Sequence, residues 1–246
     1  MTSTTMIRSD PFFYIESYEP GGTQLRPGPE TSKHIVQVLR MRPGQELYLT
    51  DGKGLLIRGR LETVDRKDAL IGISQITNLP RSSRKVIVAV SLLKNTSRFE
   101  WFLEKATELG VAAIIPLICK RSERQSFRSD RMKNVLVSAM LQSEQCWLPV
   151  LHEPVDYASL FQQPDILGVS QRFIAHCMPG AKRNLADLVN ESLPSQIILI
   201  GPEGDFTEEE VSIASDQYRF DAVSLGVTRL RTETAALVAA TILIVG

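Results

Sequence analysis

Apolar and polar positions alternate along the first third of the chain, as they do in strands that are buried on one face. Leu47 and Leu49 fall on one face of such a strand, and Asp51-Gly52-Lys53-Gly54 follows as a turn signal. Short alternating strands separated by glycine turns are typical of a small β-barrel. The expected strands are 45–50, 55–64 and 69–76, after one helix at 32–41 that Pro43-Gly44 ends.

The pattern changes at residue 86. Residues 86–93 form an unbroken apolar run, which is typical of a strand buried on both faces of a parallel sheet. Phe99, Phe102 and Leu103 then recur at helical spacing. Strands that alternate with helices predict an α/β domain with a parallel sheet. Further strands are expected at 112–118, 166–173, 196–200 and 222–225, and helices at 98–109, 129–144, 207–216 and 232–245.

A polar segment, 78–85, lies between these two patterns and carries Pro80. Segments of this composition commonly link domains. We therefore expect two domains, a β-rich domain at 1–78 and an α/β domain at 84–246.

Composition places the chain among folded proteins and excludes several classes. Hydrophobic residues make up 43% and charged residues 23% of its 246 residues, which is too apolar for a disordered chain. No apolar run approaches the ~20 residues that a membrane helix needs, and no signal-peptide core precedes residue 11. Cys119, Cys146 and Cys177 are widely spaced and form no metal or disulfide pattern. We expect a cytoplasmic protein with reduced thiols and no metal.

The charge is balanced overall but unevenly distributed. Basic and acidic residues number 28 each, and a neutral total by itself argues against a nucleic-acid partner. Residues 81–135, however, hold twelve basic and five acidic residues, whereas 136–246 hold six basic and fourteen acidic residues. The basic block contains a dense run that is either solvated surface or an RNA-binding face. This run consists of Lys120, Arg121, Arg124, Arg128, Arg131 and Lys133.

The common nucleotide-binding and hydrolase signatures GxGxxG, GxxxxGK[ST], HExxH and GxSxG are absent. A less common loop, Gly201-Pro202-Glu203-Gly204, follows a buried strand and precedes a helix that Thr207 and Glu210 are expected to start as a capping box. Such a loop is an ordinary strand–helix turn or a ligand site at the carboxyl end of a parallel strand. Its acidic residues disfavour phosphate and favour a cationic or neutral ligand.

A second loop, 226–231, also follows a strand and leads into a helix. Arg229 and Arg231 lie between two apolar elements, where an arginine must pair or face a ligand because burying it alone is costly. Thr232 is the expected N-cap of the last helix. We expect both loops to end adjacent strands and so to line one pocket.

Together the two loops resemble a known family. Gly201-Pro202-Glu203-Gly204, Leu225-Gly226 and Leu230-Arg231-Thr232-Glu233-Thr234-Ala235 are similar to the ribosomal small-subunit RNA uracil-N3 methyltransferases, which belong to the SPOUT class. Three further stretches agree over nearly the whole chain. These are His34-Ile35-Val36-Gln37-Val38-Leu39-Arg40-Met41 with Asp51-Gly52, Glu104-Lys105-Ala106-Thr107-Glu108-Leu109-Gly110-Val111, and Ser143-Glu144-Gln145-Cys146.

The resemblance implies a PUA-like RNA-binding β-barrel followed by an α/β SPOUT domain whose last strands and helix form a deep trefoil knot. It also implies S-adenosylmethionine as cofactor, a homodimer, and methylation of N3 of a uridine in 16S ribosomal RNA, within an assembled subunit. The knot rests on the resemblance alone, since ordinary chains are unknotted.

The resemblance and the loop positions together nominate site residues. Uracil N3 becomes nucleophilic as its proton leaves, so a fixed positive group is needed beside the developing charge. Arg231 is the first candidate for this group, and Arg229 or Arg98 is the second. Glu233 is either a base, a partner of an arginine or a structural residue at the helix start.

His176 is either a cofactor ligand or a loop histidine with partners of its own. The other expected cofactor residues are Ile200, Gly201, Pro202, Glu203, Gly204, Leu225, Gly226, Leu230 and Thr232, and the expected RNA contacts are Arg40, Lys94, Arg98, Lys120, Arg121, Arg124 and Arg128.

The chain departs from the family pattern at two places. Thr228 occupies the place of a common arginine, with Arg229 after it, and Trp147-Leu148-Pro149 replaces a common Gly-Arg.

Two other functions compete with uridine methylation. Ribose 2′-O methyltransferases resemble this chain, but the glycine of their early motif is missing from Asn95-Thr96-Ser97-Arg98. The second competing function is that of a noncatalytic RNA-binding or ribosome-assembly factor. The intact motifs at 201–204 and 230–234 argue against this function, because such a factor would not need to keep a cofactor site.

Overall fold

The computed structural model describes residues 10–65, 68–123 and 127–245. The chain divides into two compact units, here called the N-terminal and the C-terminal unit. The N-terminal unit comprises Met1–Arg81 and Val137–Leu148, and the C-terminal unit comprises Ser82–Leu136 and Pro149–Gly246. The compact units therefore differ from the expected ranges 1–78 and 84–246 in one respect, because 137–148 belongs with the N-terminal unit.

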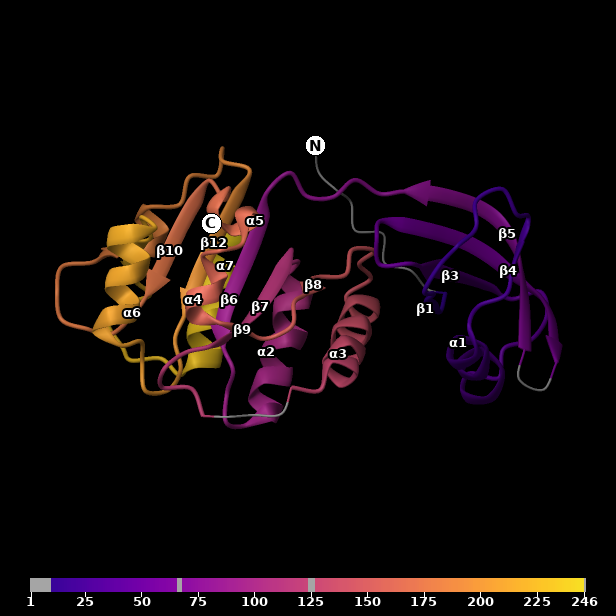
Figure 1. Cartoon of the computed structure of the whole chain (residues 1–246). Coiled ribbons are helices and arrows are strands. Elements are labelled where there is room, and N and C mark those ends of the chain that lie inside the picture. Colours follow the sequence, from indigo (N-terminus) through magenta and orange to yellow (C-terminus); the bar gives the residue numbers. More distant parts are fainter. Residues whose placement is uncertain (1–9, 66–67, 124–126, 246) are drawn as a thin grey trace. The chain divides into compact units, whose positions relative to one another are not determined.

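The N-terminal unit is built on a mixed sheet (Figure 1). Within the described residues its strand order is β1-β3-β4-β5-β2, with β1 parallel to β3 and the other neighbours antiparallel. The elements are β1 (Phe12–Tyr14), β2 (Gln24–Leu25), α1 (Pro29–Lys33), the π-helix η1 (His34–Val38), β3 (Glu46–Thr50), β4 (Leu55–Asp65) and β5 (Asp68–Asn78).

The alternation read from the sequence is confirmed in these strands. Leu47 and Leu49 are fully buried, and Ile57, Leu61 and Ile71 of the paired strands join them in one core. The helix begins earlier than expected because proline is well tolerated in a first helical turn, and Pro29 occupies that turn here. It also ends earlier, at Val38, because the chain turns into a left-handed conformation at Arg40 (φ 50°).

The C-terminal unit is built on a parallel sheet of eight strands within the described residues. The main order is β11-β13-β10-β12-β6-β7-β8, and β9 pairs with β7 beyond the end of β8. The strands are β6 (Lys85–Ser91), β7 (Ala113–Ile118), β8 (Val150–Leu151), β9 (Val155–Asp156), β10 (Gln171–Ala175), β11 (Arg183–Asn184), β12 (Ser195–Ile200) and β13 (Asp221–Ser224).

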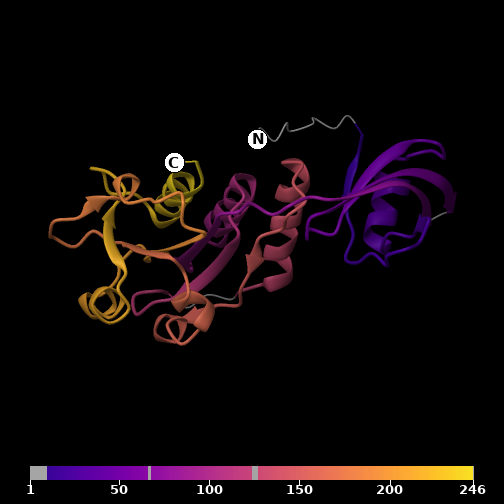
Figure 2. The ribbon, with the colours of Figure 1, turned by 90° about the horizontal axis from the view of Figure 1, so that it is seen from above.

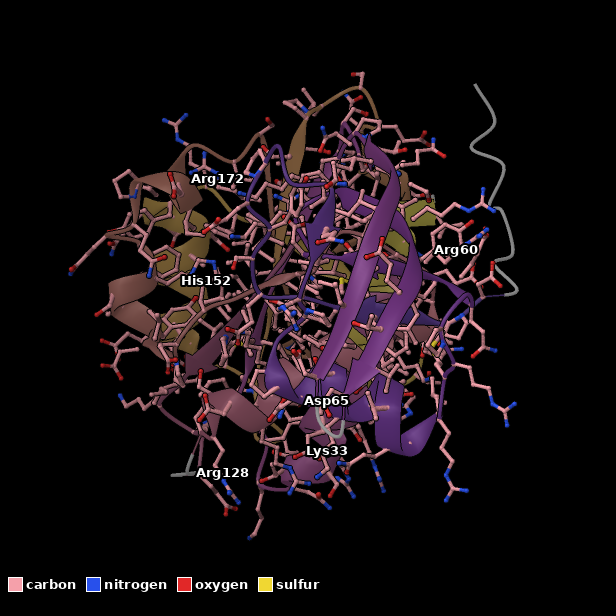
Figure 3. The ribbon with its side chains drawn as sticks, turned by 90° about the vertical axis from the view of Figure 1, so that its right-hand side faces the viewer. Lys33, Arg60, Asp65, Arg128, His152 and Arg172 are labelled. Carbon is pink, nitrogen blue, oxygen red and sulfur yellow. The ribbon has the colours of Figure 1, made fainter. Side chains whose placement is uncertain are left out.

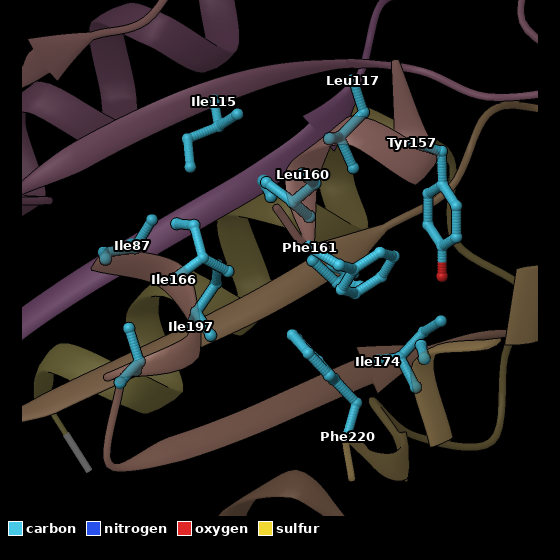
Figure 4. Close-up of a cluster of buried hydrophobic side chains, with 14 of the residues drawn as sticks. Ile87, Ile115, Leu117, Tyr157, Leu160, Phe161, Ile166, Ile174, Ile197 and Phe220 are labelled. Atoms are coloured by element: carbon cyan, nitrogen blue, oxygen red, sulfur yellow. The ribbon is translucent and has the colours of Figure 1, made fainter. Parts of the chain in front are cut away.

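Helices cover both faces of the parallel sheet (Figure 2). Helices α2 and α7 pack together on one face, where α7 also contacts β6 and β12. Helices α4, α5 and α6 cover the other face, where their apolar side chains join strand residues such as Ile87 and Ile197 in one buried cluster (Figure 4). The helices are α2 (Thr96–Leu109), α3 (Ser129–Gln142), α4 (Tyr157–Leu160), α5 (Pro164–Leu167), α6 (Glu208–Ser212) and α7 (Thr232–Val245), with the 3₁₀-helix η2 (Leu185–Asp187) and the π-helix η3 (Ile213–Gln217).

The α/β alternation is confirmed, with one clear error. The expected strand 166–173 starts as helix α5, because Pro164 sets up a first helical turn, and β10 begins only at Gln171. The short elements β8, β9, β11 and α4 were too short for a periodic signal. None of the described helices is long and apolar enough to span a bilayer. The trefoil knot stays a prediction of the resemblance.

One glycine of the N-terminal unit is required by both space and backbone conformation. Gly54 has φ +94°, and a Cβ there would meet the Trp147 ring and lie 2.8 Å from the Leu79 carbonyl oxygen. Gly44 has a similar φ of +93° but open space around its Cα. Alanine substitutions at Gly44 and Gly54 therefore distinguish the cost of backbone strain alone from the cost of strain plus steric overlap.

We expect Gly54→Ala to lower the free energy of unfolding clearly more than Gly44→Ala. The Gly44→Ala change should cost only the left-handed conformation, about 1 kcal/mol, whereas the change at Gly54 adds overlap with the indole. Urea unfolding of both variants measures the difference. Equal losses would show that Trp147 yields without cost.

Candidate active site

A cavity of about 580 Å³ opens at the carboxyl ends of β10, β12 and β13. Three strand-to-helix or strand-to-strand loops line it, because parallel strands deliver their carboxyl ends to one edge of the sheet. The lining residues include Ala175, His176, Cys177, Lys182, Ile200, Gly201, Pro202, Glu203, Asp205, Leu225, Gly226, Arg229, Leu230, Arg231 and Thr232.

The two glycine-containing loops lie in one pocket as expected, but not for the expected reason. Their strands β12 and β13 are not adjacent, because β10 is inserted between them. The carboxyl end of β10 therefore contributes the middle of the pocket wall, including His176. Strand adjacency was misjudged because pairing order is a tertiary property that chain order does not encode.

A buried hydrogen bond joins the two loops. The Thr232 hydroxyl donates to the Gly201 carbonyl oxygen at 2.9 Å. Thr232 is the first residue of α7 rather than its N-cap, and it is the Arg231 carbonyl that accepts from the Ala235 amide at 2.7 Å. The expected capping role is therefore wrong, and the threonine instead fixes the start of α7 against the Gly-Pro-Glu-Gly loop.

The capping box at the start of α6 is confirmed. The Thr207 hydroxyl accepts from the Glu210 amide, and the Glu210 carboxylate accepts from the Thr207 amide at 2.8 Å. The other Glu210 oxygen accepts from the Lys120 amide, also at 2.8 Å. This buried carboxylate thus anchors the end of β7 to the loop that follows β12.

Gly204 is the one expected cofactor residue that does not line the cavity. Its carbonyl oxygen accepts a hydrogen bond of 2.8 Å from the Arg121 guanidinium, which also donates to the Phe206 carbonyl at 3.2 Å. Arg121, expected as an RNA contact, is thereby engaged in holding this loop. A side chain 83 residues upstream in the sequence could not be assigned this role from local patterns.

His176 presents polar atoms that the fold leaves unsatisfied. Both ring nitrogens are buried and have no hydrogen-bond partner in the described part of the chain. Burial lowers the pKa of the ring, the nearby Lys182 lowers it further, and Asp205 opposes them. A neutral imidazole keeps one donor and one acceptor, which suits a polar ligand in the cavity.

Asp205 was missed by the sequence reading and ties two loops together. Its carboxylate accepts from the Cys177 amide at 2.8 Å, while its own backbone has the left-handed φ of 63°. Lys182 is a second missed lining residue. An aspartate beside the glycine of a ligand loop was the available signal for Asp205, whereas no motif marks Lys182.

The two expected catalytic arginines lie at the cavity and are exposed. Arg229 donates to the Glu203 carbonyl at 3.4 Å, which is a long hydrogen bond. The Arg231 side chain has no partner among the residues described. An arginine in this loop was expected either to pair with a carboxylate or to face a ligand. The structure favours the second alternative for Arg231.

Glu233 is buried and is not among the residues that line the cavity, although its neighbour Thr232 is. One carboxylate oxygen is 3.7 Å from Nε of Arg98 on α2, and the other is buried without a partner in the described chain. The structure thus brings Glu233 close to Arg98, which agrees with the alternative that Glu233 is a partner of an arginine.

The expected RNA contacts are only partly free. Lys94 pairs with Glu123 at 3.0 Å and Lys120 with Glu209 at 3.2 Å, both on the surface. Arg128 is exposed and projects outward (Figure 3). Arg124 lies outside the described residues, and Arg40 is exposed in the N-terminal unit.

Comparison with known proteins assigns the chain to a family. Residues 80–244 match the RNA methyltransferase domain, and residues 27–74 match the RNA methyltransferase PUA domain. The ribosomal RNA small subunit methyltransferase E of Synechocystis is 31% identical, over 84% of this chain and 68% of its own length. This chain belongs to the ribosomal RNA small subunit methyltransferase E family.

Two solved methyltransferase structures agree with the assignment. The Neisseria gonorrhoeae methyltransferase E bound to S-adenosyl methionine is 29% identical, with a TM-score of 0.82 over 94% of this chain and 95% of that chain. A Legionella pneumophila methyltransferase with bound SAM is 28% identical, with a TM-score of 0.82 over 95% and 96%. The expected fold class, an α/β SPOUT-type domain with a PUA-like domain, is confirmed. The described residues contain no cluster suited to a metal ion.

We expect Thr232→Val to lower the free energy of unfolding by about 1–3 kcal/mol, because the buried Gly201 carbonyl loses its donor. Thr232→Ser keeps the hydroxyl and should retain most of this stability. Urea unfolding of the two variants tests the bond. A valine variant as stable as the serine variant would contradict it.

The lowered pKa of His176 predicts an acid-sensitive fold. The group's ordinary pKa is 6.5, so the unfolded chain binds a proton more readily than the folded one, and the contribution of His176 is lost as pH falls below about 6.5. His152 shifts in the same direction through burial. We expect His176→Asn to lose less stability than the wild type between pH 7.5 and pH 5.5 in thermal unfolding. His34→Gln, at an exposed position, is the control and should follow the wild type.

Proposed function

We propose that this enzyme methylates N3 of a uridine in 16S ribosomal RNA, with S-adenosylmethionine as the methyl donor. Membership of the methyltransferase E family carries the proposal. The cavity between the loops after β10, β12 and β13 supports it, because ten residues nominated for the cofactor fall in or beside one concave site. Its volume of about 580 Å³ suits a ligand of nucleoside size.

The chemistry of the cavity fits the proposed cofactor. Glu203 and Asp205 contribute two carboxylates to its lining, and a carboxylate can attract a positively charged sulfonium. The unpartnered His176 nitrogens offer one donor and one acceptor to a polar ligand. The backbone of Gly201 and Gly226, with Ile200 and Leu230, would hold the adenosine portion. When bound, S-adenosylmethionine supplies a methyl group already activated by its positive sulfur.

The protein's task is then to position the base and stabilise its negative charge. Uracil N3 attacks as its proton leaves, and a cation beside O2 or O4 stabilises the anion that forms. We assign this role to Arg231, which lines the cavity without a partner in the described chain, and a secondary role to Arg229. Glu233 then acts as a positioning residue that holds Arg98 at the start of α2.

The RNA must bind beside the cavity for this reaction. Arg128 and Lys133, which are exposed and have no ion-pair partner among the described residues, supply charge for the RNA backbone. We propose that the enzyme acts as a homodimer in the cytoplasm on an assembled small subunit. A flipped uridine would enter the pocket, as bases do when an enzyme modifies them.

We expect deletion of the gene to remove 3-methyluridine from small-subunit RNA nucleosides, as measured by mass spectrometry. Complementation with the wild-type gene should restore the nucleoside. In the purified enzyme, Arg231→Ala should lower the turnover rate by about 10²–10³-fold, because the uracil anion loses the cation that stabilises it. Binding of S-adenosylmethionine, measured by calorimetry, should survive in this variant.

Arg219→Ala, at an exposed arginine that is not among the residues lining the cavity, is the matched control and should restore the nucleoside fully. An unchanged nucleoside profile after deletion would refute the proposed function. Loss of a 2′-O-methylated nucleoside instead would favour the ribose-methylating alternative, and absent cofactor binding would favour the noncatalytic one.

A further inference from the structure

The wall of the active-site cavity contains a lysine to which the proposed reaction gives no role. Lys182 lines the cavity from the segment that joins β10 to β11, and its side chain is half-buried. The next residue, Arg183, pairs with Val223 of β13, which itself lines the cavity. Strand pairing therefore holds Lys182 at the edge of the sheet where the cavity opens.

The protein satisfies the ammonium group of Lys182 only in part. This group donates to the Met178 carbonyl, within its own segment. An ammonium has three donors, so two remain. No carboxylate in the described part of the chain forms an ion pair with it. A charge that is partly removed from water without a counter-charge is costly, and an anionic ligand in the cavity would lower that cost.

The carboxylate of Asp205 lies in the same wall but is engaged elsewhere. One of its oxygens accepts from the Cys177 amide and the other from the Phe206 amide, each at 2.8 Å. Each of these bonds satisfies a backbone group of a sharp loop. Asp205 is therefore committed to the loops and does not neutralise Lys182.

His176 shows that the ammonium of Lys182 acts on the middle of the cavity wall. Burial is the main cause of the lowered pKa of the imidazole, and the positive charge of Lys182 lowers this pKa further. Both ring nitrogens are buried without a hydrogen-bond partner in the described chain. Lys182 and His176 thus place a cation and two unsatisfied polar atoms in one part of the cavity.

The other cations of the cavity wall lie in a different loop. Arg229 and Arg231 both belong to 226–231 and are exposed, whereas Lys182 is half-buried and belongs to the segment after β10. The wall therefore carries positive charge on two separate loops. Two negative groups can be held independently, one by the arginines and one by the lysine.

The chemistry of S-adenosylmethionine supplies one such group. Its negative charge is confined to the carboxylate of the methionine end. The groups that would hold the adenosine portion, such as Leu230 and the Gly201 backbone, offer no positive charge to that carboxylate. Hydrogen bonds between an ammonium and a carboxylate are charge-assisted and strong, and a lysine makes them without the planar geometry that an arginine imposes.

We propose that Lys182 binds the methionine carboxylate of S-adenosylmethionine and so selects ligands that carry an amino-acid tail. The two donors that Met178 leaves available would hold the carboxylate. The inference rests on the proposed function, since it takes this cofactor as the ligand. Lys182 is then a specificity residue of the cofactor site, because the carboxylate takes no part in methyl transfer.

Calorimetric titration with four ligands tests the contact. S-adenosylmethionine and S-adenosylhomocysteine carry the carboxylate, whereas decarboxylated S-adenosylmethionine and 5′-methylthioadenosine lack it. Lys182→Met should weaken binding of the first two by about 10–100-fold, as expected when a charged group loses its hydrogen-bond partner. The same variant should bind the other two within twofold of wild type. Lys182→Arg keeps the charge and should weaken the first two less than Lys182→Met does.

Arg183→Ala is the matched control, because this adjacent arginine is exposed and is not among the residues that line the cavity. It should leave all four affinities within twofold of wild type. Equal losses for all four ligands in Lys182→Met would overturn the inference, since that result indicates that the lysine only shapes its segment through Met178. Unchanged affinity for S-adenosylmethionine in Lys182→Met would overturn it as well.

The inference and the proposed function fail in different ways. A wild-type enzyme that binds none of the four ligands would contradict the proposed cofactor and the inference together. A wild-type enzyme and a Lys182→Met variant that bind S-adenosylmethionine equally well would overturn the inference alone. In that case the loss of 3-methyluridine after gene deletion would still support the proposed function.

Discussion

The common direction of the strands in the parallel sheet is the constraint on which the site depends. Because β10, β12 and β13 run in the same direction, their carboxyl ends and the loops that follow meet at one edge. The buried bond from Thr232 to Gly201 then fixes the start of the last helix against one of these loops. This buried bond and the longer, exposed bond from Arg229 to the Glu203 carbonyl join the two loops, and the cavity depends on both loops.

Much of the charge near this edge maintains structure rather than binding ligand. Arg121 supports the Gly204 carbonyl, Glu210 receives the Lys120 amide, and Asp205 receives the Cys177 amide. Each of these bonds satisfies a backbone group that a sharp loop leaves without a regular partner. The arginines that remain without partners in the described chain, such as Arg231, are then the ones available for a reaction.

The basic excess of residues 81–135 illustrates how a charge count differs from a binding surface. Lys94 and Lys120 pair with nearby carboxylates, and exposed pairs of this kind contribute little to stability. These two ion pairs do, however, reduce the positive electrostatic potential of residues 81–135. Arg128 and Lys133 are exposed and have no ion-pair partner among the described residues, so the positive charge left free in this block is smaller and more localised than the residue count suggested.

The sequence by itself determined most of the element types, the family and the position of the loops that line the cavity. Apolar periodicity marked the strands and most helices, and the capping box at Thr207 is a local motif that needs no tertiary context. The resemblance at 201–204 and 225–235 located the cavity loops and the family. Local signals suffice there because helix caps, glycine turns and apolar runs depend on neighbours within a few residues.

Only the tertiary structure decided which residues meet. It placed β10 between β12 and β13, moved Thr232 from a cap to a bridge, and turned Glu233 toward Arg98. It also left both nitrogens of His176 buried without a hydrogen-bond partner in the part of the chain that the structure describes. Each outcome depends on contacts between segments far apart in the chain, and no pattern within one segment specifies the partner that the fold brings to it.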